Sequence, residues 1–222
     1  MRRILILVEG QTEERFVKDV LQPFLWKVGV HIEPKIATTK RVKQGADFKG
    51  GVTSFHKIED DIRRLVGDSN ASLITTMIDY YGLPGDFPKI QNFQGTASRE
   101  RARALEMALE EYLNFGSRFL AYFMVHEFEA LLFSQPAILS EVMNVPSSCF
   151  KLQEIRDRFS TPEEINDSPE TRPSARILNL FPSYRKRIHG PITSTRIGLE
   201  TMRQECSHFN EWCIKLEKIG SQ

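Results

Sequence analysis

Short apolar segments, separated by longer polar stretches, are the strongest structural signal in the first half of the chain. Residues 3–8 (RILILV), 72–78 (SLITTMI) and 119–125 (FLAYFMV) are mainly apolar runs, and a further strand is expected at residues 30–37. Continuous apolar runs of this length are typical of strands that are buried on both faces of a parallel sheet. The pattern therefore predicts four strands.

Between these segments, apolar residues recur at helical spacing. After the first strand, Phe16, Val20 and Phe24 would lie on one face of a helix, and residues 54–66 and 98–113 are also predicted to be helical. Stretches that are rich in glycine and polar residues are predicted to be loops, at residues 38–53 and 80–96.

After residue 133 the strand-like runs stop. Pro136 and Pro162 are each expected to open a short helix, because proline is favoured in the first helical turn. Longer helices are predicted at residues 174–181, 193–205 and 208–218.

The order of these elements predicts an α/β fold. A four-stranded, mostly parallel sheet flanked by helices would occupy residues 1–133, and a helical region packed on it would occupy residues 134–222. The composition agrees, because 41% hydrophobic and 27% charged residues are ordinary values for a globular protein. A chain of 222 residues is long enough for one such core.

The apolar content is also too dispersed for a membrane protein. No apolar run approaches the ~18 residues that a membrane span needs. The apolar start is shorter than that of a signal peptide and is followed by Glu9 and Gly10 instead of a small-residue cleavage site. We therefore expect a cytoplasmic protein that does not bind a membrane. The three cysteines form no CxxC pair, so neither a disulfide framework nor a cysteine zinc site is expected.

Positive charge is concentrated in two places although the net charge is only +1. Between residues 171 and 199 the chain has no acid, and the stretch around residues 40–49 has the single acid Asp47. Each group is either a solvated surface or a surface that faces phosphate. The basic residues are Arg172, Arg176, Arg185, Lys186, Arg187 and Arg196 in the first group, and Lys40, Arg41, Lys43 and Lys49 in the second.

Acidic residues follow three of the four predicted strands. Glu9 and Glu13 follow the first, Asp79 ends the third, and Glu127 and Glu129 follow the fourth. Since the carboxyl ends of parallel strands meet at one edge of a sheet, we expect these acids to converge. Clustered carboxylates repel one another unless a cation lies between them, and hard oxygen ligands suit Mg²⁺ or Mn²⁺. If the fourth strand continued through Glu127 and Glu129, their side chains would point the same way.

Taken singly, each acid also has an ordinary structural interpretation. Glu13 could serve a helix dipole, Asp79 could cap a turn, and Glu127 could be a solvated charge. Chance seldom places acids at the same end of three buried strands, so the group as a whole favours a cation site.

The motif Glu9-Gly-x-x-Glu13 after a first strand, with an acid ending a later strand, resembles the Toprim domain of topoisomerases, primases and nucleases. The segments VEGQTEERFV, MIDYYGLP and HEFEALLF resemble a Toprim-related family that carries only a domain-of-unknown-function label. With FPSYRKRIHGPIT and IGLETMRQECSHFNEW, this resemblance covers nearly the whole chain.

Among Toprim enzymes, the arrangement looks most like the overcoming-lysogenization-defect nucleases. That resemblance implies a metal-binding and catalytic set formed by Glu9, Glu13, Asp79, Glu127 and Glu129. It also implies a late basic residue that contacts phosphate, for which we choose Lys186, with Arg185 and Arg187 as alternatives.

The chain departs from the Toprim pattern at one position. The second Toprim motif is Asp-x-Asp, but Tyr81 stands where its second acid should be. Either Glu127 compensates or one metal position is weaker, so two-metal catalysis is in doubt while one-metal chemistry is unaffected. Topoisomerase activity is not expected, because the chain has no recognisable second domain with a tyrosine nucleophile.

The sequence therefore predicts a Mg²⁺- or Mn²⁺-dependent nuclease that hydrolyses phosphodiester bonds of DNA or RNA. The resemblance implies a partner ABC-type ATPase, which would be a separate polypeptide because the chain has no GxxxxGK[ST] loop. Anti-phage defence would be the setting. The rival hypothesis is a non-catalytic module that binds phosphate or nucleic acid and regulates a partner ATPase. A small-molecule phosphatase is a third class, for which the chain lacks a motif.

Overall fold

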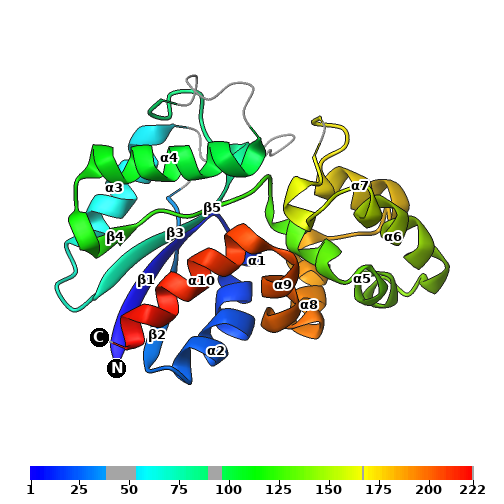
Figure 1. The fold of residues 1–222 in the computed structure, drawn as a ribbon, viewed down its shortest axis with the longest axis horizontal. Helices are drawn as coiled ribbons and strands as arrows, with labels where there is room; N and C mark the ends of the chain where they lie inside the picture. The colour runs from blue at the N-terminus through cyan, green and yellow to red at the C-terminus, as the bar shows by residue number, and fades with distance from the viewer. Residues whose placement is uncertain (39–53, 90–96, 167, 222) are drawn as a thin grey trace, which may run out of the picture.

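The computed structural model describes residues 1–38, 54–89, 97–166 and 168–221. Its centre is a sheet in which every pair of strands is parallel, in the order β2-β1-β3-β4, with β5 also pairing with β3 (Figure 1). This confirms the predicted α/β fold with a parallel sheet. The strands are β1 (Arg2–Val8), β2 (Val30–Ile36), β3 (Leu73–Asp79), β4 (Phe119–Leu120) and β5 (Phe123–Met124).

Helices connect the strands and form most of the second half of the described chain (Figure 1). One continuous helical segment follows β1 and consists of α1 (Gln11–Phe16), the π-helical turn η1 (Val17–Leu21) and α2 (Gln22–Trp26). The other α-helices are α3 (Phe55–Val66), α4 (Ser98–Leu113), α5 (Pro136–Val142), α6 (Cys149–Asp157), α7 (Pro173–Leu180), α8 (Lys186–Ile197), α9 (Leu199–Glu205) and α10 (Ser207–Gly220). Shorter 3₁₀ turns are η2 (Tyr80–Gly82), η4 (Gly116–Arg118), η5 (Phe128–Ser134), η6 (Pro146–Ser148) and η7 (Pro162–Glu164).

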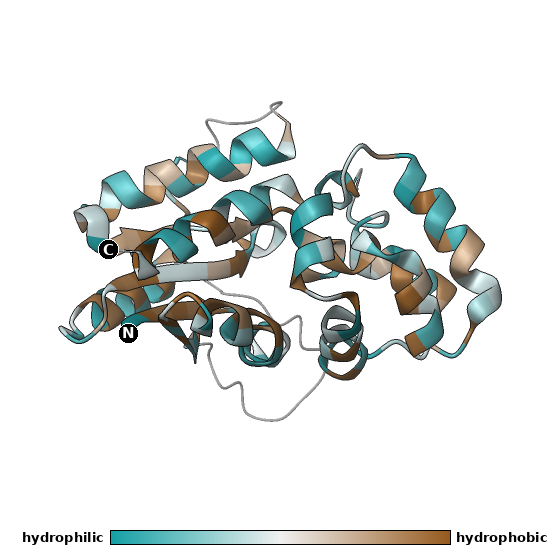
Figure 2. Cartoon of the chain, turned by 60° about the horizontal axis from the view of Figure 1, so that its bottom comes forward, coloured by the Kyte–Doolittle hydropathy of each residue, from teal (hydrophilic) through white to brown (hydrophobic). Residues whose placement is uncertain are grey.

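The two faces of the sheet support two apolar cores. Successive side chains of a strand point to opposite faces, so Ile4 and Ile6 enter the core shared with α1 and α10, whereas Leu5 and Leu7 enter the core shared with α3 and α4. All four side chains are fully or almost fully buried. The strands are accordingly apolar along most of their length, while the helices alternate between apolar and polar faces (Figure 2).

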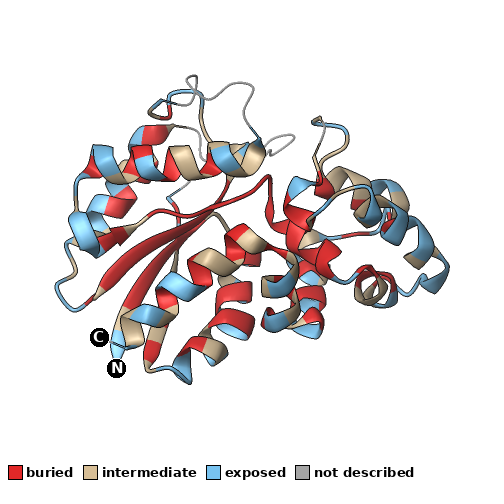
Figure 3. Ribbon diagram, in the orientation of Figure 1, coloured by how far each residue is buried: buried red, intermediate tan, exposed pale blue. Residues whose placement is uncertain are grey.

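The last helix ties the helical region to the sheet. Helix α10 packs on the same face as α1 and buries Phe209, Trp212 and Leu216 in the first core. The indole nitrogen of Trp212 donates a hydrogen bond to Thr75 Oγ1, on β3, at 3.0 Å. Strands β1 and β3 are buried along most of their length and β2, at the edge of the sheet, only in part, whereas the outer surfaces of helices such as α6 are exposed (Figure 3).

The fourth strand differs from the prediction. Instead of one strand over residues 119–125, the chain forms two short strands, β4 and β5, with a break at Ala121 and Tyr122. There the hydroxyl of Thr76 accepts a hydrogen bond from Tyr122 N at 2.8 Å and donates one to Tyr122 O at 2.8 Å. A threonine side chain therefore replaces the regular backbone ladder, which the apolar pattern could not indicate.

One of the predicted helices also differs. The helix predicted at residues 193–205 is divided at Gly198, whose φ of +80° ends α8, and α8 begins much earlier, at Lys186. Gly190 and Pro191, which lie before the predicted helix, are inside α8. The sequence gave no signal for α6. The loop expected at residues 38–53 and the basic residues at 40–49 lie outside the described part of the chain, apart from Thr38.

None of the helices in the described ranges is both long enough and apolar enough to cross a lipid bilayer.

Candidate functional site

The acids that follow β1 and β3 lie side by side at the carboxyl edge of the sheet. The two strands are hydrogen-bonded neighbours, with Val8 opposite Met77, so their last residues meet. Glu9 comes directly after β1, and its Oε2 accepts a hydrogen bond from Asp79 N at 3.3 Å. The acids at the ends of β1 and β3 therefore lie together in the structure, as expected.

Glu13 joins this edge from the helix that follows β1. It lies in the first turn of α1, where the helix dipole favours a carboxylate, and its side chain is buried. The position that suits the helix dipole also places the carboxylate beside the other acids, so the dipole interpretation of Glu13 does not conflict with its expected place in the acidic group.

The chain reaches the third acidic position by a turn. Strand β5 ends at Met124, and His126 has a φ of +67°, so the backbone reverses before η5 begins at Phe128. The strand does not continue through Glu127 and Glu129, so the condition under which their side chains would point the same way is not met, and the two side chains contact different partners. Phe128 N donates to Asp79 Oδ1 at 3.0 Å, which fixes the start of η5 against the end of β3.

Lys186 brings these acids to one point. Its ammonium nitrogen lies 3.2 Å from Glu13 Oε1, 3.3 Å from Glu129 Oε2 and 3.4 Å from Asp79 Oδ2. It also lies 5.9 Å from the centre of the Phe128 ring, within the range of a cation–π contact. We call Glu9, Glu13, Asp79, Glu129 and Lys186 the carboxylate–lysine cluster.

Close packing of α8 against α1 explains how a residue so distant in sequence reaches the cluster. Lys186 is the first residue of α8, and Gly190 lies about one turn further along the helix. A Cβ atom at Gly190 would lie 3.2 Å from the Phe128 ring, 3.3 Å from Thr12 and 3.4 Å from the Tyr184 hydroxyl. Glycine at this position therefore lets α8 approach α1 and η5 closely.

Burial and mutual repulsion dominate the electrostatics of the cluster. Burial raises the pKa of Glu129 to about 6, and the nearby acids Glu127 and Glu13 add to the rise while Lys186 opposes it. The pKa of Asp79 is raised well above its ordinary value by burial and by its acidic neighbours, and that of Glu9 is raised for similar reasons. Burial lowers the pKa of Lys186, but the surrounding carboxylates outweigh this and raise it well above its usual range.

Glu127 lies next to the cluster but has other partners. Its carboxylate accepts hydrogen bonds from the backbone N–H of Ser174 and, at 3.0 Å, from the Ser174 hydroxyl. Arg172 Nε is 4.0 Å from the same carboxylate. Glu127 thus anchors the N-terminus of α7, and the structure separates it from Glu129, with which the sequence grouped it.

No pattern in the sequence predicted Tyr184, Ser174 or the role of Arg172. The Tyr184 hydroxyl donates to Glu129 Oε1 at 3.5 Å, and burial raises the pKa of this phenol well above its ordinary value. Tyr184 is two residues before Lys186 in the segment FPSYRKR, so its position in the sequence was a usable signal. Contacts to Ser174 depend on the turn at residue 126, and no local pattern indicates them.

The donor atoms of the cluster suit a hard divalent cation. Glu13 Oε1 and Glu129 Oε2 are buried and receive no hydrogen bond from the described residues, although each forms an ion pair with Lys186. Buried carboxylate oxygens without hydrogen bonds are costly, and a cation would satisfy them. In the present arrangement no three histidine, cysteine or acidic side chains of the described residues are placed to hold an ion, so Lys186 would have to move.

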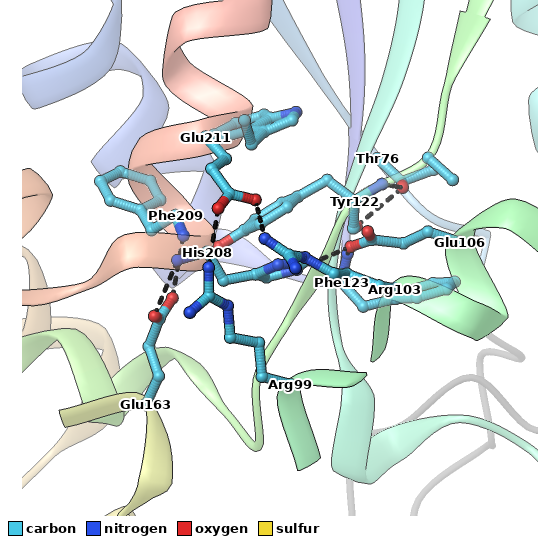
Figure 4. Close-up of polar contacts among 12 residues, drawn as sticks. Thr76, Arg99, Arg103, Glu106, Tyr122, Phe123, Glu163, His208, Phe209 and Glu211 are labelled. Atoms are coloured by element: carbon cyan, nitrogen blue, oxygen red, sulfur yellow. Dashed lines mark hydrogen bonds and ion pairs between the residues drawn. The ribbon is translucent and has the colours of Figure 1, made fainter. Parts of the chain in front are cut away.

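A second buried polar cluster, between α4 and α10, has a different construction (Figure 4). The Glu163 carboxylate accepts backbone N–H groups of His208 and Phe209, both at 2.9 Å, and thereby caps α10. Glu106 Oε1 accepts from Phe123 N at 2.8 Å and lies 2.9 Å from His208 Nε2. These acids secure a helix end and the broken edge strand, so we interpret this cluster as structural.

Comparisons with known proteins give a family but no characterised relative. A search of curated proteins found no match, and neither did a search of solved structures. Residues 8–217 match the family described as a domain of unknown function, DUF4276, and this range includes every residue of the carboxylate–lysine cluster. The chain is therefore a member of the DUF4276 family.

Proposed function

We propose that this protein is a metal-dependent nuclease that hydrolyses phosphodiester bonds of nucleic acid at the carboxylate–lysine cluster. The observation that carries the proposal is the convergence of three carboxylates on one ammonium group at the carboxyl edge of a parallel sheet, with the carboxylate of Glu9 beside them. Ligands bind at this edge in open parallel sheets. Four acids against one lysine leave excess negative charge for a divalent cation to balance.

Asp79, Glu129 and Glu13 would hold a Mg²⁺ or Mn²⁺ ion, with Glu9 beside them. Such an ion would stabilise the charge that develops on the phosphate and lower the pKa of a water molecule. Phe128 N fixes one oxygen of Asp79, and Tyr184 contacts one oxygen of Glu129, so both carboxylates are oriented before any ion binds. Orientation of this kind is what a site of high affinity requires.

Lys186 would act in two ways. Without an ion, its ammonium group partly neutralises the three acids that it contacts. Its side chain is 36% exposed, so the long stem can turn toward solvent when an ion enters. There the ammonium group would pair with a substrate phosphate, a contribution of a few kcal/mol to stabilising the developing charge.

The proposal includes a Toprim-type site, a partner ATPase and a role in anti-phage defence. The similarity to overcoming-lysogenization-defect nucleases supports a cytoplasmic effector that works with a separate ABC-type ATPase in anti-phage defence. Supporting this arrangement, the chain contains no GxxxxGK[ST] phosphate-binding loop of its own. A pull-down with the candidate ATPase, compared between wild type and a surface-charge control, tests the partner.

One observation favours the rival function, a non-catalytic module that binds phosphate or nucleic acid. Tyr81 replaces the second acid of the Asp-x-Asp motif, and Lys186 already balances part of the remaining negative charge. A protein with this arrangement could bind a substrate and signal to an ATPase without cutting it.

A cleavage assay separates the two functions. Labelled single- and double-stranded DNA and RNA are incubated with Mn²⁺, with and without the ATPase, because Mn²⁺ tolerates imperfect oxygen geometry better than Mg²⁺. Cutting by wild type should be lost in Asp79→Asn and Glu129→Gln and retained in Glu154→Gln, an exposed acid on α6. Cutting that persists in the first two variants would show a contaminant, and binding without any cutting would support the module.

A further inference from the structure

Tyr81 lies at the border of the carboxylate–lysine cluster with a ring that remains accessible. Its N–H donates to His126 O at 3.0 Å, which fixes the backbone next to the turn that leads to η5. The next residue, Gly82, touches the cluster, because a Cβ atom there would lie 3.6 Å from Glu9 Oε2. Tyr81 as a residue is nevertheless 38% exposed, which leaves it accessible to a ligand.

Arg172 covers the ring without being strongly held by other groups. Its guanidinium carbon lies 5.6 Å from the ring centre of Tyr81. The contact of its Nε with Glu127 Oε2 is long, at 4.0 Å, and this Nε is buried and has no hydrogen-bond partner among the described residues, so the exposed part of the guanidinium is the part that a ligand can reach. The side chain is 40% exposed. A guanidinium group placed in this way can accept a phosphate as a ligand.

The neighbouring tyrosine shows what a structural tyrosine looks like at this edge. The Tyr80 hydroxyl accepts a hydrogen bond from Arg101 at 2.7 Å, and its ring packs against the core beneath α3 and α4. The Arg101 guanidinium also lies over that ring, at 5.8 Å. Tyr80 is thus committed to the protein interior at both its ring and its hydroxyl, whereas Tyr81 is exposed and has the Arg172 guanidinium over its ring.

We propose that Tyr81 and Arg172 bind one nucleotide of a single-stranded nucleic acid beside the carboxylate–lysine cluster. Tyr81 stacks on an unpaired base, and Arg172 pairs with an adjacent phosphate. The inference rests on the proposed function for its choice of ligand, because it assigns the substrate class of the same site.

Base stacking is what selects a single strand. In a duplex the faces of the bases are occupied by their neighbours, so an aromatic side chain can stack only on a base that is unpaired or displaced. Stacking depends little on base identity, because every base has an aromatic face. The pair should therefore favour single strands over duplexes of the same sequence while discriminating weakly among bases.

Binding of a fluorescent oligothymidylate tests the stacking role without any cleavage. Anisotropy is measured in EDTA and again with Ca²⁺, alongside an oligonucleotide of equal length whose sugars carry no bases. Tyr81→Ala should weaken binding of the oligothymidylate roughly 5- to 100-fold, the range expected for the loss of one stacked base. Tyr81→Phe should bind like wild type. On the abasic strand, wild type and Tyr81→Ala should bind equally.

Tyr112 provides a matched control, because it is an exposed tyrosine on α4 whose ring packs on Phe55 in the other core region. Tyr112→Ala should leave binding unchanged. Three results would overturn the inference: equal binding by wild type and Tyr81→Ala on the oligothymidylate, an equal loss on both strands, or no binding by wild type in either buffer.

The phosphate contact is tested by salt dependence. Arg172→Gln should reduce the slope of log affinity against log salt by about 0.7, the value for one phosphate contact on a single strand. Arg158→Gln is the control. Arg158 is an exposed arginine at the C-terminal end of α6, where it pairs with Glu154. An unchanged slope in Arg172→Gln would contradict the assignment of Arg172.

The outcomes for this inference and for the nuclease proposal are separable. If the protein cuts nucleic acid but Tyr81→Ala binds normally, the stacking assignment fails and the nuclease stands. If wild type binds through Tyr81 but never cuts, the stacking assignment stands and the nuclease fails.

Discussion

The acids between α4 and α10 are as deeply buried as those at the sheet edge, yet their surroundings differ. Glu163 and Glu106 are 3% and 8% exposed, and Glu129 and Asp79 are 1% and 8% exposed. Both oxygens of Glu163 accept backbone N–H groups, which are neutral and fixed (Figure 4). At the sheet edge the carboxylates lie close to one another, and Glu129 Oε2 accepts no hydrogen bond from the described residues, although it forms an ion pair with Lys186 at 3.3 Å.

The pKa values express the same difference. Burial raises the pKa of Glu163, but the N–H groups of His208 and Phe209 oppose the rise. For Asp79, burial is reinforced by three neighbouring acids, and Lys186 opposes them. Buried acids with fixed donors stabilise a fold, whereas buried acids that face one another destabilise it. We infer that the first kind maintains the structure and that the second kind is kept for a ligand.

The largest expected effect is on stability, at the structural cluster. Glu163→Ala leaves two buried N–H groups at the start of α10 without acceptors, so the free energy of unfolding should fall by about 3 kcal/mol. Urea denaturation measures this, with Glu154→Ala as an exposed control. If Glu163→Ala lowers the free energy of unfolding no more than Glu154→Ala does, the cluster around Glu163 is not structural.

The second effect is a pH dependence at the carboxylate–lysine cluster. The folded-state pKa of Glu129 is about 6, above its ordinary 4.5, so folded protein binds more protons than unfolded protein between these values. The free energy of unfolding in the absence of metal should therefore fall as pH rises through this window, by about 2 kcal/mol from this one group. Glu129→Gln should lose this part of the dependence, as measured by urea midpoints. An identical pH profile in the variant would contradict the assignment.

Removing the lysine should leave the acids of the carboxylate–lysine cluster free to bind an ion. Lys186→Met takes away the ammonium group that an ion would have to displace, so Mn²⁺ should bind roughly tenfold more tightly. Binding of single-stranded nucleic acid should lose about 0.7 of salt slope. Calorimetry and anisotropy measure the two effects, and Lys151→Met on α6 is the control. Weaker Mn²⁺ binding in Lys186→Met would place the ion elsewhere.

The smallest effect concerns the missing motif acid. Tyr81→Asp restores Asp-x-Asp, and because Tyr81 is partly exposed, a charge there should change the free energy of unfolding by less than about 1 kcal/mol. Mn²⁺ affinity should rise a few-fold if the Toprim alignment is right. A large loss of stability, with no gain in affinity, would show that residue 81 does not face the cluster.

The sequence indicated the strands and the acids at their ends better than it indicated the turns between them. Strands β1 and β3 follow from continuous apolar runs, and their adjacency brings Glu9 and Asp79 together. The separation of Glu127 from Glu129 depends on a positive φ at His126. A positive φ is uncommon for a residue other than glycine, so the sequence gives no signal for it.

Long-range packing between helices was the second feature that the sequence could not predict. The apolar pattern cannot show that Gly190 lets α8 approach α1, and this approach is what carries Lys186 to the acids. Lys186 was chosen on family resemblance, and its contacts come from the tertiary structure. The structural cluster of Glu106, Glu163 and His208 was missed entirely, because its members are distant in sequence and belong to no motif.

The most direct test of the account is the effect of Mn²⁺ on thermal unfolding. An ion that binds only the folded protein stabilises it by mass action, by about 2.7 kcal/mol at a hundredfold excess over its Kd. Wild type and Glu154→Gln should therefore show a clear rise in Tm with Mn²⁺, whereas Asp79→Asn and Glu129→Gln should show little or none. The same rise in all four proteins, or none in wild type, would contradict a cation site at the carboxylate–lysine cluster.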